Sequence, residues 1–373
     1  MKIVLIGGHL TPALSVLEAL SKDTEVLFVG RKYSLEGDRA LSLEYETITQ
    51  LKVPFVGLNT GRWQRKLTKF TFFSLLKIPF GIIKSFLILI EFRPDVVVGF
   101  GGYVSVPVIM SAFLLRIPIV IHEQTLEAGF ANRFLARFAT KICVSWNSSG
   151  KYFPKKKIIF TGNPIRKFPI SNFQFPISKK NLPMIYITGG SSGSHFINVL
   201  IEGIIKKLLE KYIVVHQTGD AQEFHDFERL EQLKNTLPIL LRQRYILKKF
   251  VDPTEVGDLL SKASLIITRS GINTVTEIIY FKKPALLIPL PFSQSNEQLK
   301  NAKFLEKIGL GKVLQQEELD SKKLYNSINL MFDNVDNYKI DKKELKVLPG
   351  RNGAQNIISV INYVHKSKTA KIS

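Results

Sequence analysis

The stretch KIVLIGGHLTPALSV, residues 2–16, contains the pattern on which the fold depends. An apolar run ends at Ile6, Gly7 and Gly8 follow, and Pro12 stands in the first turn of an expected helix. A strand that passes through glycines into a helix is typical of a parallel sheet with an anion-binding turn. The turn ends in His9, and a histidine at this place calls for a functional explanation beyond phosphate binding.

The same alternation of strand and helix continues along the whole chain. Further apolar runs occupy residues 25–30, 95–100, 117–123, 141–145, 184–190, 212–219, 264–271 and 284–290. Continuous β-branched runs separated by helices predict parallel sheets covered on both faces, which bind ligands at the carboxyl ends of their strands. We therefore predict an α/β chain with a first domain over 1–163, a proline-rich linker over 164–183 and a second domain over 184–350. A last helix over 352–366 is expected to join the first domain.

Composition sets limits on function. The chain has 373 residues, of which 45% are hydrophobic, so a sizeable core is expected. The single cysteine, Cys143, excludes a disulfide framework and fits a reducing cytoplasm, and no secretory leader precedes the first strand. The net charge is +21, of which +14 falls in residues 1–180 and +7 in the remainder. This excess favours an anionic partner, and the lack of nucleic-acid-binding signatures favours an anionic membrane surface over nucleic acid.

Two apolar segments raise the question of membrane contact. Residues 96–115 are uncharged, but their glycines and Pro107 indicate a strand, a loop and a buried helix rather than a span. Residues 69–92 hold more large apolar side chains than one core face requires, among them Phe72, Phe73, Leu76 and Phe80. They form either a buried helix between domains or a helix lying in one membrane leaflet. No spanning helix is predicted.

The second half contains two candidate anion-binding turns. In YITGGSSGSHF, residues 186–196, glycines open the turn before a helix, and Ser191 adds a hydroxyl donor. In TRSGINTVTEI, residues 268–278, a helix follows Gly271 and bears Thr274 and Glu277. A carboxylate at this place can accept hydrogen bonds from ribose hydroxyls, although a solvated helical glutamate is the commoner explanation of such a residue.

These motifs together closely resemble those of the MurG family. GGSSG, HQTG, TRSGINTVTEI and NEQLKNA occur in the second half, and GGH, GFGGYVSVP, HEQ and GNPIR in the first. The resemblance covers about residues 1–365. It implies two Rossmann-like domains facing across a cleft, the GT-B glycosyltransferase fold. It further implies a peripheral enzyme at the cytoplasmic face of the cell membrane, which moves N-acetylglucosamine from UDP-N-acetylglucosamine to undecaprenyl-diphosphate-linked N-acetylmuramoyl pentapeptide in peptidoglycan synthesis.

The resemblance also implies roles for individual residues. The donor would be bound by Arg166, Ser191, Val251, Ile272, Asn273, Thr274, Glu277 and Gln298, with Thr125 and Glu297 near the sugar. The acceptor diphosphate would lie at Gly7, Gly8, Gly101, Gly102 and Tyr103. His9 or Glu123 would be the general base. Helix N-termini would stabilise the leaving diphosphate, and since the chain contains no Asp-x-Asp triplet, neither a bound metal nor a cofactor is expected.

The chain departs from the family pattern at three places. The family's longer leader, Gly-Gly-Thr-Gly-Gly-His, is shortened here to Gly7, Gly8 and His9, which leaves fewer backbone amides for an acceptor diphosphate. Thr125 replaces an asparagine, and Glu297 replaces the first of two glutamines. The alternatives that stay open are a diacylglycerol or other lipid glycosyltransferase of the same fold, a UDP-sugar 2-epimerase, and a silent nucleotide-binding scaffold.

Overall fold

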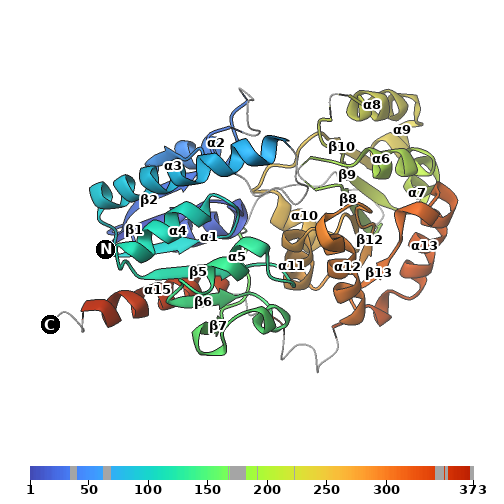
Figure 1. Cartoon of the computed structure of the whole chain (residues 1–373). Coiled ribbons are helices and arrows are strands. Elements are labelled where there is room, and N and C mark those ends of the chain that lie inside the picture. Colours follow the sequence, from blue (N-terminus) through green and yellow to red (C-terminus); the bar gives the residue numbers. More distant parts are fainter. Residues whose placement is uncertain are drawn as a thin grey trace. The chain divides into compact units, whose positions relative to one another are not determined.

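Two compact units make up the chain, and each is an α/β sandwich around a parallel sheet (Figure 1). The computed structural model describes residues 1–33, 40–61, 69–166, 168, 182–190, 192–221, 223–340, 348 and 352–369. The first unit comprises Met1–Arg166 and Leu348–Ser373, and the second Lys167–Val347. The first unit therefore extends to Arg166 rather than to residue 163.

The sheet of the first unit has the order β3-β2-β1-β4-β5-β6-β7, and its strand pairs are parallel. Its strands are β1 (Lys2–Ile6), β2 (Glu25–Gly30), β3 (Phe55–Gly57), β4 (Val96–Gly99), β5 (Ile119–Glu123), β6 (Lys141–Val144) and β7 (Ile158–Phe160). Its helices are α1 (Leu10–Ala19), α2 (Leu43–Gln50), α3 (Lys69–Phe92), α4 (Ser105–Leu114), α5 (Phe130–Leu135) and α15 (Gly353–Thr369). Residues 96–115 thus form a strand, a loop and a helix, as predicted.

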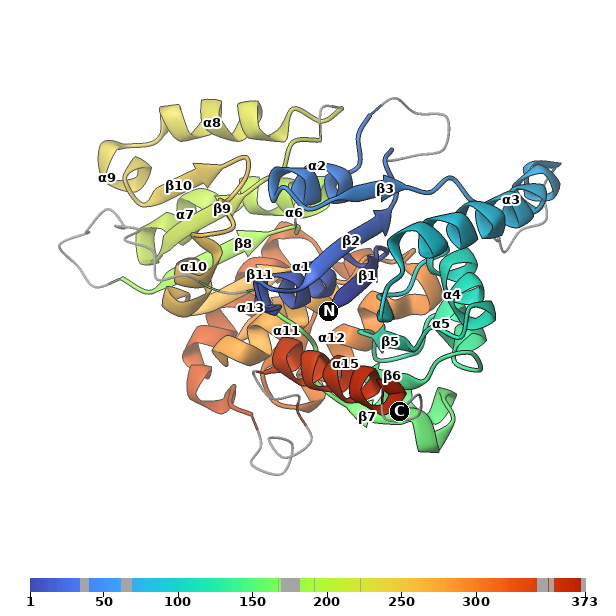
Figure 2. The ribbon, with the colours of Figure 1, turned by 90° about the vertical axis from the view of Figure 1, so that its left-hand side faces the viewer.

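The last helix returns to the first unit. Along α15, Ala354, Ile357 and Ile361 are buried in one core cluster with residues of β1 and α1. Asn356 donates a hydrogen bond to the Thr161 carbonyl oxygen at 2.9 Å, just after β7. Figure 2 shows α15 and α1 covering the same side of the sheet. The first unit is therefore assembled from both ends of the chain.

The sheet of the second unit has the order β10-β9-β8-β11-β12-β13 and is also parallel. Its strands are β8 (Met184–Thr188), β9 (Ile213–Gln217), β10 (Tyr245–Lys248), β11 (Leu265–Thr268), β12 (Ala285–Leu287) and β13 (Gly311–Val313). Its helices are α6 (His195–Glu202), α7 (Ile205–Lys211), α8 (Asp226–Thr236), α9 (Ile239–Arg242), α10 (Val256–Lys262), α11 (Ile272–Phe281), α12 (Glu297–Lys307) and α13 (Ser321–Asp333).

Both strand orders contain a point at which the direction of winding reverses. In the first sheet it lies between β1 and β4, and in the second between β8 and β11. Open α/β sheets bind ligands outside the carboxyl ends of the strands at such a switch point. The glycine turns that the sequence singled out, 7–9 and 101–103 in the first unit and 189–194 and 270–271 in the second, follow these four strands.

Candidate active site

The two glycine turns of the first unit meet at its switch point. A Cβ on Gly8 would lie 2.3 Å from the Gly101 carbonyl oxygen, and a Cβ on Gly102 would lie 3.0 Å from the Gly8 Cα. Gly101 and Gly102 also have φ angles of +85° and +74°, which larger residues rarely adopt. Only glycine fits at these contacts, and they bring Gly7 and Gly8 together with the loop that leads to Tyr103.

His9 closes the first turn and has one ring nitrogen fixed. Its Nδ1 lies 2.7 Å from the carbonyl oxygen of Phe100. A carbonyl oxygen only accepts hydrogen bonds, so Nδ1 bears the hydrogen, and the neutral ring keeps its lone pair on Nε2. The side chain is partly exposed. His9 therefore has the tautomer that a general base acting through Nε2 requires.

Glu123, the other expected base, is buried at 1% exposure and already has four donors. Its Oε1 accepts from the Thr125 N–H at 2.9 Å and the Thr125 hydroxyl at 2.6 Å. Its Oε2 accepts from the Gly129 N–H at 2.9 Å and from Nδ2 of Asn132 at 3.0 Å. These bonds fix the loop after β5, so the contacts of Glu123 favour a structural role over proton transfer.

Thr125 was expected near the sugar, but its hydroxyl is engaged within the protein. Besides Glu123 it contacts the carbonyl oxygen of Glu127. A hydroxyl has one hydrogen to donate, and both of these neighbours accept. The Thr125 hydroxyl could donate to a sugar only if its hydrogen left both of these acceptors.

Glu44 is a residue of this site that the sequence did not indicate. Its carboxylate lies between Gly7 and Gly30, where any Cβ would come within 2.4 Å of a carboxylate oxygen. It accepts from the Gly8 N–H at 3.0 Å and from the Arg31 N–H at 2.8 Å. Burial raises the pKa of Glu44, and the hydrogen bonds from Arg31 and Gly8 oppose this shift without cancelling it. In the sequence Glu44 resembles an ordinary acidic residue in the first turn of a capped helix.

The turn after β8 in the second unit is closely packed. A Cβ on Gly189 would lie 2.3 Å from the backbone of Gly193, and one on Gly193 would lie 1.9 Å from the Thr218 carbonyl oxygen. Ser194 caps α6, with its hydroxyl accepting from the Ile197 N–H at 3.5 Å. Ser191, the expected diphosphate contact, lies outside the described residues.

Arg269, at the end of β11, is a second residue that sequence reasoning did not assign to the site. Its Nε and Nη2 donate to the Ser194 hydroxyl oxygen at 3.2 and 2.9 Å. Its Nη1 donates to the carbonyl oxygens of Ile288 and Pro289 at 3.0 and 3.3 Å. Burial lowers the pKa of Arg269 to about 10, so the group stays charged at neutral pH. A cation bonded to neutral acceptors beside a glycine turn is suited to stabilise an anion.

The helix after Gly271 presents the other expected donor residues. Ile272 is buried, Asn273 and Thr274 are partly exposed, and Glu277 is 6% exposed one turn further along α11. Val251, expected at the uracil, is 9% exposed and follows β10. Arg166 is partly exposed at the end of the first unit's main segment.

Gln298 connects two loops near α11. Its Oε1 accepts from the Leu290 N–H at 2.9 Å, and its backbone oxygen accepts from the Ser270 hydroxyl at 2.7 Å. These bonds occupy the acceptor of the side-chain amide and leave its NH₂ group, which can donate to sugar hydroxyls. Glu297, one residue earlier, is partly exposed at the start of α12.

A buried polar network holds the Thr218 carbonyl oxygen, on which the glycine turn before α6 packs. Asp226 accepts from Asn198 Nδ2 at 2.7 Å and from Arg229 Nη2 at 2.7 Å, and it pairs with His195 Nδ1 at 2.8 Å. Nδ2 of Asn198 also donates to the Thr218 carbonyl oxygen at 3.1 Å, the atom against which Gly193 packs. Burial opposes ionisation of Asp226, but these hydrogen bonds outweigh it and lower its pKa.

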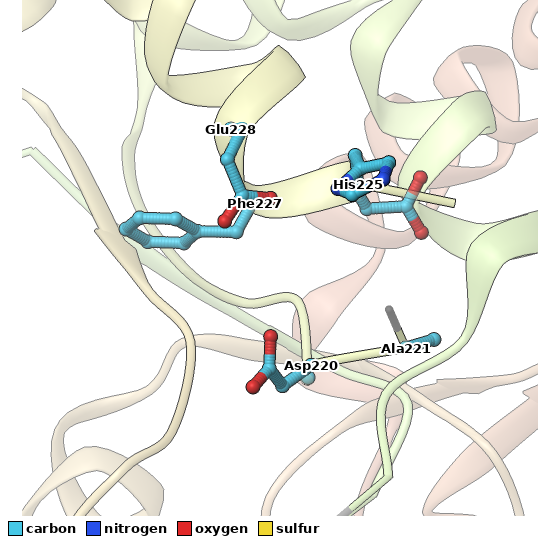
Figure 3. A pocket seen from close by; sticks show the side chains of 7 residues that line it. Asp220, Ala221, His225, Phe227 and Glu228 are labelled. Carbon is cyan, nitrogen blue, oxygen red and sulfur yellow. The ribbon is translucent and has the colours of Figure 1, made fainter. Parts of the chain in front are cut away.

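Figure 3 shows a small cavity beside this network, at the start of α8. Asp220 and Ala221 lie on one side of it, and His225, Phe227 and Glu228 on the other. Its volume of about 20 Å³ holds a water molecule and is far too small for a nucleotide. This cavity is therefore not a donor site.

Comparison with known proteins identifies the class first. The N-terminal domain model of glycosyltransferase family 28 matches residues 6–144, and the C-terminal domain model of the same family matches residues 184–359. With the two parallel sheets described above, these matches define a two-domain glycosyltransferase of the GT-B type.

A curated protein of Treponema denticola narrows the class further. It is the UDP-N-acetylglucosamine–N-acetylmuramyl-(pentapeptide) pyrophosphoryl-undecaprenol N-acetylglucosamine transferase, and it is 33% identical over 84% of this chain and 82% of its own length. The crystal structure of Acinetobacter baumannii MurG is 26% identical, with a TM-score of 0.69 over 97% of this chain and 100% of that one. The chain belongs to the MurG family.

The UDP-GlcNAc 2-epimerase of Neisseria meningitidis is similar in fold alone. Its structure has a TM-score of 0.64 over 97% of this chain and 100% of that one, at 16% identity. The fold is therefore shared with epimerases, and it does not by itself select a reaction.

Proposed function

We propose that the chain transfers N-acetylglucosamine from UDP-N-acetylglucosamine to the 4-hydroxyl of a polyprenyl-diphosphate-linked N-acetylmuramoyl pentapeptide, a step of peptidoglycan synthesis. The observation that supports this most strongly is the 33% identity to a transferase of that name over 84% of the chain. The glycine turns agree with it, since two of them lie at the switch point of each sheet, where α/β sheets bind ligands.

The second unit is proposed to bind the donor. The turn before α6 and the N-terminus of α11 both present backbone N–H groups, and Arg269 adds a charged donor beside the first. Glu277 would accept hydrogen bonds from the ribose hydroxyls, and the side-chain amide of Gln298 would donate to the sugar. Negative charge grows on the leaving diphosphate, and such fixed dipoles and cations stabilise it most in the transition state.

The first unit is proposed to supply the base. The acceptor hydroxyl oxygen attacks the anomeric carbon while the bond from that carbon to the diphosphate breaks, and UDP leaves. Because the attack is in line with the departing diphosphate, the α-linked donor gives a β-1,4 product, and His9 Nε2 takes the hydroxyl proton. We expect no metal or cofactor in this reaction because Arg269 and two helix N-termini supply the positive charge that the leaving group needs.

A membrane surface is proposed as the place of reaction. Along α3, Phe80, Ile83 and Leu87 are 74%, 59% and 60% exposed, whereas Ser85 and Leu89 on the opposite face are buried. Phe113 and Leu114 of α4, which packs against α3, are also exposed. Within the described residues no helix combines the length and hydropathy needed to cross a bilayer. We therefore infer peripheral binding to the cytoplasmic face, through this apolar surface and the positive charge around it. The side chains of Phe72, Phe73 and Leu76 lie outside the described residues.

A transfer assay tests the proposal. Radiolabelled UDP-N-acetylglucosamine is incubated with a short-chain analogue of the diphosphate-linked acceptor, and with diacylglycerol in a parallel reaction. We expect label in the first lipid only. Label in diacylglycerol would support the other lipid transferase, and conversion of the UDP-sugar to its 2-epimer in the absence of lipid would support the epimerase. Absence of all three products would contradict transferase function.

A further inference from the structure

The glycine turn before α1 has fewer free amides than its sequence suggests. The Gly7 N–H donates to the Val29 carbonyl oxygen at 2.8 Å, and the Gly8 N–H donates to Glu44 at 3.0 Å. Of the backbone amides expected near an acceptor diphosphate, the two in this first turn are therefore satisfied within the protein. This turn, already shorter than the family pattern, therefore offers a diphosphate neither glycine N–H, and a cationic side chain nearby would supply the missing charge neutralisation.

Glu44 holds the backbone of Arg31, whose side chain can neutralise the charge of a diphosphate. The same carboxylate that accepts from Gly8 accepts from the backbone N–H of Arg31, at 2.8 Å. Ser42, the N-cap of α2, donates its hydroxyl hydrogen to the Arg31 carbonyl oxygen at 2.5 Å. Both backbone groups of Arg31 are thus held, and its side chain starts beside the Gly7–His9 turn.

The guanidinium of Arg31 reaches towards the second glycine turn. Its central carbon lies 6.0 Å from the centre of the Tyr103 ring, within the range of a cation–π contact. Tyr103 directly follows Gly101 and Gly102 in the loop before α4. Within the described part of the chain, the guanidinium makes no hydrogen bond and no ion pair; its contact there is the one with the Tyr103 ring. Its donors are therefore available for a ligand.

We propose that Arg31 binds the diphosphate of the lipid-linked acceptor. The inference rests on the proposed function and adds to it a residue that the family motifs did not indicate. A planar guanidinium can donate two parallel hydrogen bonds to phosphate oxygens, and the cation–π contact with Tyr103 keeps it beside the second glycine turn. In this chain Arg31 takes over the charge neutralisation for which the shortened glycine turn has no free amides.

The test compares substrates in a set of variants. Arg31→Gln and Arg31→Lys are assayed with a short-chain, water-soluble acceptor diphosphate, which removes membrane binding from the measurement. For Arg31→Gln we expect the KM for acceptor to rise about tenfold or more, as for loss of a charged hydrogen bond, with the KM for UDP-N-acetylglucosamine unchanged. Arg31→Lys keeps the charge but loses the fork, and its acceptor KM should lie between those of Arg31→Gln and the wild type.

Lys32→Ala is the matched control. Lys32 is the next cation in the chain, is exposed, and also lies over an aromatic ring, that of Tyr45 at 5.5 Å. Its removal should leave the acceptor KM within about twofold of wild type. An unchanged acceptor KM in Arg31→Gln, or an equal rise in Lys32→Ala, would overturn the proposal while wild-type transfer stands. If the wild type transfers no sugar to the acceptor, the proposed function itself fails, and the two failures are thereby distinguished.

Discussion

His9 and Glu123 differ in whether their side chains have a lone pair available to accept a proton from a substrate. His9 has a lone pair on a partly exposed ring nitrogen, because Phe100 fixes the hydrogen on the other. Glu123 is buried and accepts four hydrogen bonds. We therefore expect His9→Ala to lower kcat by a factor of about 10² to 10⁴, with the KM for UDP-N-acetylglucosamine unchanged. Steady-state kinetics would check this, and a kcat within tenfold of wild type would exclude His9 as the base.

Glu123→Gln should act on stability instead. The NH₂ group of the new amide would face one of the N–H or O–H groups that now donate to the carboxylate. Two donors would then oppose each other in place of a buried hydrogen bond. We expect the free energy of unfolding of the first unit to fall by about 3 kcal/mol. Urea unfolding can be followed through Trp146, which is buried and bonded to the Gln124 carbonyl oxygen at 2.8 Å. Full stability combined with a large loss of kcat would instead make Glu123 a catalytic residue.

Helices α3 and α4 expose large apolar side chains that the packing of the first unit does not bury. Two neighbouring helices expose phenylalanine, isoleucine and leucine side chains on one unit, and apolar surface of this kind marks an interaction site. We expect Phe80→Asp with Leu87→Asp to reduce binding to anionic liposomes at least about tenfold, since each change places a charge at the acyl boundary. Flotation assays would measure this.

A matched pair on α9 provides the control for that prediction. Ile239 and Leu240 are 68% and 66% exposed in the second unit, so Ile239→Asp with Leu240→Asp makes the same chemical change elsewhere. Liposome binding should persist in the α9 variant. Equal loss in both variants would point to a general effect of added negative charge rather than to a membrane-binding face.

The hydrogen bond between Asn198 of α6 and Asp226 of α8 leads to a further prediction. Asp226, the first residue of α8, orients Asn198 of α6 and through it the Thr218 carbonyl oxygen beneath the glycine turn. Asp226→Asn would set two amide groups against each other, and we expect the KM for UDP-N-acetylglucosamine to rise about tenfold while kcat changes less. Glu228→Gln, two residues along α8, is the control: Glu228 pairs with the partly exposed Lys249 at 2.9 Å, and its replacement should leave the donor KM unchanged.

At the scale of the whole molecule, each unit contains a buried neutral histidine. Burial lowers the pKa of His122 and of His216 to about 3. An unfolded histidine titrates near 6.5, so the unfolded chain binds more protons between these values, and stability falls as the pH falls through that window. The pH dependence of Glu44 is opposite: because its pKa is raised, its contribution to stability is lost as the pH rises above 4.5.

At pH 5 we expect urea unfolding to take up about two protons at His122 and His216, measurable by titration. Uptake near zero would show that they are charged in the folded state.

The sequence allowed the sheets and their glycine turns to be predicted, because strand runs and turns are local patterns. It did not indicate Glu44, Arg269 or Asp226, whose partners lie far along the chain. Glu44 bonds Gly8 across 36 residues, and Arg269 bonds Ser194 across 75. Their positions depend on which strands become neighbours in the sheet, and a short stretch of sequence does not determine the strand order. Short strands such as β3 and β13 were missed for the related reason that three residues show no period.

The return of α15 to the first unit has a consequence for biosynthesis. A ribosome adds every residue of the second unit before it adds the α15 residues that pack on β1 and α1, so the first unit begins the chain but cannot complete its core until synthesis ends. Until then, the nascent N-terminal sheet exposes the apolar side chains against which Ile357 and Ile361 later pack. A premature stop codon at position 348 would therefore leave the second unit, Lys167–Val347, whole and would remove α15 from the core of the first unit.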